Sequence, residues 1–210
     1  MEATKERRTV TTQINIRSMD NEEGKPPVIE GYALKFETKS EKLGLYNEFV
    51  EILARGCLDH TDMTNVVALY NHDENYPLAR NTVPEGIGSL KLSVDDVGLR
   101  FELIPTDTSY AKDLLTNLRA GVVGQCSFAF ALASEGANWL YDKDNDIYQR
   151  TITDIGRLYD VSIVTRPAYP DTEASTAERS LKDFKTVENE IAQNEVRKRK
   201  LAIEVELMEG

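Results

Sequence analysis

The chain contains only two histidines, His60 and His72, and they are the first residues to consider for acid–base chemistry. Imidazole readily takes and returns a proton near neutral pH. His60 lies in a polar loop, where we expect an exposed side chain. His72 follows the apolar run 66–70, so we expect it at the end of a strand, which would hold a general base rigidly. On this evidence alone, a structural role remains the simpler explanation for His72.

Two adjacent residues, Cys126 and Ser127, are candidates for a nucleophile. Side chains alternate between the faces of a strand, so Cys126 shares a face with Phe128 and Phe130, and Ser127 shares the other with Ala129. We therefore expect Cys126 to be buried. Two preceding glycines would let a substrate carbonyl approach Ser127. An ordinary strand serine is the alternative.

An acid that orients the imidazole is the third requirement of such a site, and two carboxylates lie inside apolar strand-like segments. Asp160 lies in the run 158–164, where burying it without a partner would be costly. Glu102 is similarly placed in the run 99–104. Strand alternation could instead direct both side chains to solvent, and we favour that interpretation for Glu102.

Metal binding is not predicted. The acidic segment 142–146 resembles the start of a calcium-binding loop, but Ile147 replaces the required glycine and Thr153 replaces the bidentate glutamate. A hairpin turn explains this segment better. The His and Asp residues between positions 60 and 73 lack the tight spacing of zinc motifs. We expect neither a metal nor another cofactor.

The elements that must position these residues are mostly strands. Alternating or continuous apolar segments predict strands over residues 10–16, 28–36, 49–53, 66–70, 122–132, 147–155 and 158–165. The runs 90–94 and 99–103 flank turn-forming residues and predict a β-hairpin. A helix is predicted from Asp107 or Thr108 to Gly121. We therefore expect a mostly β (α+β) fold.

Composition restricts the function classes. Acidic side chains number 36 and basic ones 25, and a net charge of -11 argues against a general nucleic-acid binder. The two cysteines could form at most one disulfide, so we expect a reducing, intracellular setting. No apolar run approaches the ~20 residues of a membrane-spanning helix, and we expect no membrane association.

The amino-acid composition of the chain changes near residue 172. Residues 173–210 are charged, include the cationic run 197–200, and carry only a thin apolar stripe. We expect a single domain over residues 1–172, followed by a helical or flexible tail over residues 173–210.

The order of the motifs resembles the tailed-phage prohead maturation proteases over about residues 28–172. The similarity is carried by the segment 31–36, by Asn71-His72-Asp73, by Ser127-Phe128-Ala129-Phe130 and by the segment 160–170. The resemblance implies a fold related to the herpesvirus capsid-assembly protease: a closed β-barrel surrounded by helices.

The resemblance also implies site residues. The histidine of the family's Asn-His-Asp motif falls on His72, and the serine of its Ser-Phe-x-Phe motif falls on Ser127. Asp160 matches the family's late acidic position, with Glu102 as the alternative third member. Arg166 lies where the herpesvirus relatives place an arginine-bearing oxyanion loop.

The function implied is that of a serine endopeptidase that cleaves capsid or scaffold proteins, and itself, during procapsid maturation. Its partners would be the major capsid protein, the scaffold protein or the portal, and it could form a homodimer. It would act in the host cytoplasm, inside the assembling procapsid. The alternative is a non-enzymatic capsid-assembly protein that retains the protease fold.

Overall fold

A computed structural model describes residues 4–10, 14–17, 26–44, 48–165 and 175–209. Its largest sheet has the strand order β1-β9-β12-β5-β6. The strands of this sheet are β1 (Glu6–Val10), β9 (Gln125–Leu132), β12 (Ile155–Val164), β5 (Val67–Tyr70) and β6 (Asp73–Arg80).

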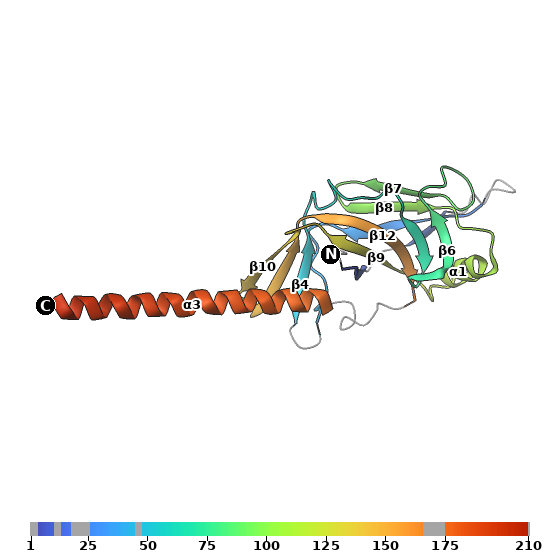
Figure 1. Ribbon diagram of the computed structural model, residues 1–210. Helices are drawn as coiled ribbons and strands as arrows, with labels where there is room; N and C mark the ends of the chain where they lie inside the picture. The colour runs from blue at the N-terminus through green and yellow to red at the C-terminus, as the bar shows by residue number, and fades with distance from the viewer. Residues whose placement is uncertain (1–3, 11–13, 18–25, 45–47, 166–174, 210) are drawn as a thin grey trace.

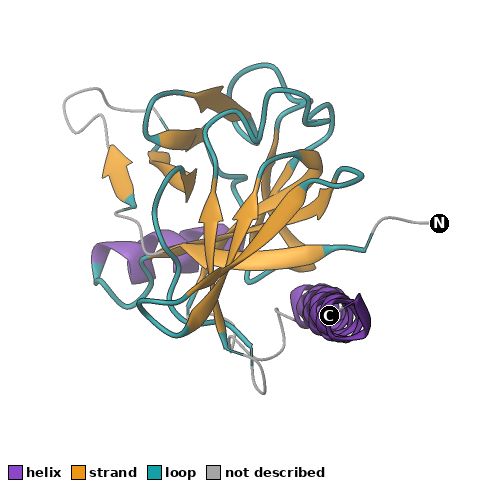
Figure 2. Ribbon diagram, turned by 90° about the vertical axis from the view of Figure 1, so that its left-hand side faces the viewer, coloured by secondary structure: helices purple, strands orange, loops and turns teal. Residues whose placement is uncertain are grey.

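Two smaller sheets complete the body (Figure 2). The first has the order β2-β3-β8-β7 and consists of β2 (Asn15–Arg17), β3 (Val28–Lys35), β8 (Gly98–Leu103) and β7 (Leu90–Val94). The second has the order β10-β11-β4 and consists of β10 (Ala137–Asp142), β11 (Ile147–Ile152) and β4 (Phe49–Leu53).

The expected closed barrel is wrong, because the strands form three open sheets. Closure would require the end strands of a sheet to pair, yet in the described residues β1 and β6 are separate edges of the largest sheet. The sheets instead share one apolar core, to which Ile29 and Phe101 of one sheet contribute beside Phe128 and Ile163 of another. Side-chain packing, rather than continuous hydrogen bonding, joins the sheets.

The predicted hairpin and helix are confirmed. Strands β7 and β8 pair antiparallel, and Asp95 Oδ1 accepts hydrogen bonds from the backbone N–H groups of Val97 and Gly98 at 2.8 and 3.0 Å. A Cβ at Gly98 would lie 2.0 Å from the carbonyl oxygen of Leu34, so the neighbouring strand requires glycine there. Helix α1 (Ser109–Arg119) buries Leu114 and Leu115.

Several strands differ from expectation. The strand expected over residues 10–16 overlaps the end of β1 and the start of β2, with residues 11–13 outside the described part of the chain, and the strand expected over residues 147–155 divides into β11 and the start of β12. Most of strand β1 lies in the charged N-terminal segment, where the sequence predicts no strand. Strands β6 and β10 are not predicted either. These strands lack a clear apolar alternation: β1 is rich in charge, and β6 exposes most of its side chains. Pairing with a neighbouring strand therefore decides their conformation more than their own pattern does.

The segment 173–210 contains one long helix, α3 (Ser175–Glu209). Its first turns pack on the sheet β10-β11-β4, where Ala177 and Leu181 are buried beside Leu43 and Phe49. The indole N–H of Trp139 donates to Ser180 Oγ at 2.9 Å. The rest of α3 extends away from the body (Figure 1). Neither α3 nor α1 is long and apolar enough to span a membrane.

Candidate active site

Three neighbouring strands bring the candidate residues together. Strand β12 lies between β9 and β5, so Asp160 on β12 is next to both the strand that carries Ser127 and the strand that precedes His72. In the β9–β12 register, Ser127 faces Ser162 and Ala129 faces Asp160. Period-2 alternation then places Ser127, Asp160 and Ser162 on one face of the sheet.

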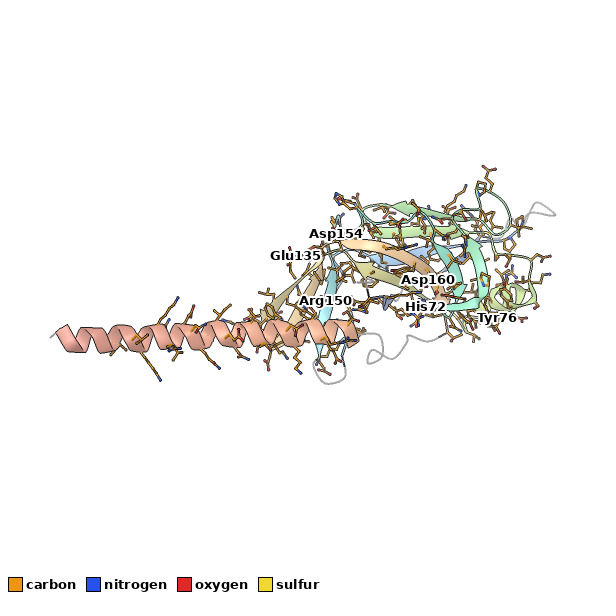
Figure 3. The ribbon with its side chains drawn as sticks, viewed as in Figure 1. His72, Tyr76, Glu135, Arg150, Asp154 and Asp160 are labelled. Atoms are coloured by element: carbon orange, nitrogen blue, oxygen red, sulfur yellow. The ribbon has the colours of Figure 1, made fainter. Side chains whose placement is uncertain are left out.

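The side chains form a continuous chain of contacts. His72 Nε2 lies 2.6 Å from Ser127 Oγ, and His72 Nδ1 lies 2.5 Å from Asp160 Oδ1. An ionised carboxylate can only accept, so Nδ1–H is the donor and Nε2 of the neutral imidazole can accept the serine proton. Figure 3 shows His72 next to Asp160. This arrangement can perform nucleophilic acyl transfer.

His72 reaches over the sheet because of an unusual turn between β5 and β6. Asn71 and His72 both have φ of 56°, the left-handed region that few residues other than glycine adopt. The Asn71 N–H donates to the carbonyl oxygen of Ile163, and Asn71 Oδ1 accepts from the Thr165 N–H, both at 3.0 Å. Asn71 therefore fixes the turn that positions the imidazole.

Asp160 is almost completely buried but well supplied with partners. Its Oδ1 also accepts a hydrogen bond from Ser162 Oγ at 2.8 Å, and Lys5 Nζ lies 3.3 Å from its Oδ2. Burial raises the pKa of the carboxyl, but the hydrogen bond and charge of His72, with Ser162 and Lys5, leave that pKa below its ordinary value of 3.8. Asp160 is therefore ionised at neutral pH.

Cys126 is turned away from this site, as strand alternation predicts. It is buried in the apolar core beside Phe128, and burial strongly raises the pKa of its thiol. A thiol held in the neutral form is a poor nucleophile. The oxygen of Ser127, rather than the sulfur of Cys126, contacts His72.

The other candidates are not brought to the site. Glu102, on β8, pairs with Arg17 at 3.0 Å and Arg100 at 2.9 Å in a different sheet. His60 lies in an exposed loop. Arg166 lies outside the described residues. The segment 142–146 forms the turn between β10 and β11, as predicted.

Sequence reasoning missed Asn71, Ser162 and Lys5. Ser162 could have been found, because it is two residues from Asp160 and therefore shares its face. Asn71 carries a weaker signal, since asparagine tolerates the left-handed conformation. Nothing in the sequence around Lys5 indicates its contact with Asp160, because that contact depends on the pairing of β1 with β9.

Comparisons with known proteins identify the family. The family model of the caudovirus prohead serine proteases matches residues 12–187. Among solved structures, the chain is similar to the capsid assembly protease of bacteriophage T4, with 16% identity and a TM-score of 0.37 over 76% of this chain and 98% of that chain. No curated protein sequence matches. The family match extends from before β2 into the docked turns of α3, and the chain belongs to the caudovirus prohead serine proteases.

Proposed function

We propose that the chain is an active serine endopeptidase that cleaves capsid or scaffold proteins inside the assembling procapsid, with Ser127 as nucleophile, His72 as general base and Asp160 as the orienting acid. The contact chain Ser127–His72–Asp160 carries this proposal. A non-enzymatic protein would have no need to hold these three side chains, from distant parts of the sequence, in hydrogen-bond contact.

The geometry of the three side chains supports the following reaction. Ser127 Oγ attacks the carbonyl carbon of the scissile peptide while His72 Nε2 takes the hydroxyl proton. The imidazolium formed is stabilised by Asp160. His72 then gives its proton to the leaving amine as the C–N bond breaks, which leaves an acyl-enzyme. Water, deprotonated by His72, attacks the acyl-enzyme and releases the second product. Arg166 remains our proposal for the loop that holds the oxyanion.

Co-expression tests this function. The full chain is produced with the capsid and scaffold proteins of the same virus, and the intact mass of each protein is measured. We expect shortened capsid or scaffold protein with the wild type and with Cys126→Ser, and none with Ser127→Ala. Cleavage that persists with Ser127→Ala would contradict the proposal, as would its loss in a folded Cys126→Ser.

A further inference from the structure

Gln125 lies next to the proposed nucleophile on the same face of β9. Side chains two positions apart on a strand point to the same side, and a rise of about 3.3 Å per residue separates Gln125 from Ser127 by about 7 Å along the strand. On the neighbouring strand β12, Gln125 lies opposite Val164, and Ser127 lies opposite Ser162. Gln125 therefore borders the candidate active site without taking part in its chain of contacts.

The start of β9 offers a ligand room beside Gln125. Ser127 is 0% exposed, whereas Gln125 is partly exposed and Gly124 is exposed. A Cβ built at Gly124 would meet no atom of the described residues within 4 Å apart from its chain neighbours. Val122, two residues earlier, is 67% exposed. The described part of the chain thus leaves open space where β9 begins, and Gln125 lies between this space and the nucleophile.

The side chain of Gln125 has an acceptor that the folded chain leaves unused. Its Oε1 is buried, and no donor in the described part of the chain reaches it. An unpaired buried oxygen costs free energy, and most such atoms in proteins have a partner. Two further oxygens on this face lack a hydrogen bond: Thr9 Oγ1, opposite Ser127 on β1, and Asp160 Oδ2, which faces a positive charge. Of the three, only Gln125 Oε1 belongs to a residue that adjoins the open space at Gly124.

A substrate can supply the missing donor. An extended peptide advances by about 3.3 Å per residue, as β9 does, so a peptide with its scissile carbonyl at Ser127 Oγ brings a residue two positions away beside Gln125. A carbonyl oxygen accepts a hydrogen bond from an N–H or O–H group. The side chains of lysine, arginine, asparagine, glutamine, serine and threonine carry such a group. An apolar or acidic side chain would leave Gln125 Oε1 without a donor.

We infer that Gln125 is a specificity-determining residue of the protease, and that its Oε1 selects a donor side chain at one substrate position, two residues from the scissile bond. This inference rests on the proposed function. Gln125 takes no part in proton transfer, which Ser127 and His72 carry out. Its substitution should therefore change which peptides are cleaved and leave the chemistry at Ser127 in place.

A profile of cleavage sites tests this selection. The full chain is incubated with a proteome-derived peptide library, and the new termini are sequenced by mass spectrometry. We expect the wild type to favour donor side chains at the position two residues from the scissile bond. Gln125→Glu should enrich lysine and arginine there by at least about tenfold, equivalent to about 1.4 kcal/mol, because a hydrogen bond between opposite charges is stronger than one to a neutral amide. Gln125→Met should instead favour apolar side chains there.

Gln149→Glu is the matched control. Gln149 lies on β11 in a different sheet, where its amide donates to Thr151 Oγ1 at 3.5 Å, and this variant should have the wild-type profile. We also expect Gln125→Met to raise Tm, because it removes an unpaired buried oxygen with little change in side-chain size.

The outcomes separate this inference from the proposed function. An unchanged profile in the folded Gln125→Met chain, or changes spread over every substrate position, would overturn the inference. A lower Tm with Gln125→Met would show that Oε1 has a partner in the free chain and would overturn it as well. Absence of any cleavage by the wild type would instead contradict the proposed function.

Discussion

The proposed catalytic residues are held by more than their mutual contacts. His72 takes its position from a strained turn that Asn71 fixes, and Asp160 is ionised because His72, Ser162 and Lys5 outweigh its burial. The other histidine, His60, lies in an exposed loop instead. At the scale of single residues, the supporting contacts distinguish a catalytic candidate from a structural one.

Substitution of the orienting acid tests its role. We expect Asp160→Asn to lower the cleavage rate by about 10⁴-fold, against about 10⁶-fold for His72→Ala, because an orienting acid is less indispensable than the base. Glu102→Gln is the matched control and should cleave like the wild type, since Glu102 pairs with Arg17 and Arg100 far from the site. Initial cleavage rates of a capsid-derived peptide measure this. The reverse ranking of the two variants would move the third member to β8.

The lowered pKa of Asp160 also predicts how stability depends on pH. The folded pKa lies below the ordinary 3.8, so the ionised carboxylate stabilises the folded chain above that pH, and this contribution is lost as the pH falls through the folded pKa. Asparagine does not titrate. We expect the difference in Tm between wild type and Asp160→Asn to be constant above the ordinary pKa of 3.8 and to shrink as the pH falls below that value. A difference that stays constant below that value in thermal unfolding would show that Asp160 is not charged in the folded chain.

At the scale of elements, the sequence predicts the strands and helices that have a clear apolar spacing or turn signal within their own residues. The β7–β8 hairpin and helix α1 follow from turn chemistry and helical spacing, and the placement of Cys126 on the face opposite Ser127 follows from alternation on β9. Strand β1 could not be predicted in this way, because the partners of its buried charged side chains include Glu51 on β4 and Arg150 on β11, which are distant in the sequence. Long-range pairing of this kind leaves no local signal.

The docked and free parts of α3 should respond differently to substitution. Leu181 is fully buried against the sheet β10-β11-β4, whereas Ile191 is 55% exposed. We expect Leu181→Ala to lower the free energy of unfolding by about 2–4 kcal/mol and Ile191→Ala to change it by less than about 0.5 kcal/mol. Urea unfolding of the full chain measures both. Equal effects would mean that the first turns of α3 do not belong to the folded body.

At the scale of the whole molecule, three open sheets share one core, and the candidate active site lies on the largest of them. The closure of the sheet that the resemblance implied is wrong, whereas the proposed site residues lie in hydrogen-bond contact. The three side chains come together because of the strand order β9-β12-β5 and the register of these strands. Neither the order nor the register requires the sheet to close into a barrel.

The free part of α3 is a candidate substrate of the enzyme itself. Val187, Val196 and Leu201 are each more than half exposed, so little packing protects this part of the helix from local unfolding. We expect wild-type preparations to contain C-terminally shortened chains that Ser127→Ala preparations lack. Intact-mass measurement of both proteins decides this, and identical full-length masses would refute self-cleavage.

Ser127 and His72 should act as one catalytic unit, and a comparison of their single and double substitutions tests this coupling. The measurement is the cleavage rate of one capsid-derived peptide by His72→Ala, Ser127→Ala, the double variant and the control His60→Ala. We predict that each of the two single variants loses about 10⁶-fold, that the double variant is scarcely worse, and that His60→Ala keeps wild-type activity. Losses that multiply in the double variant, or a greater loss with His60→Ala than with His72→Ala, would contradict the account.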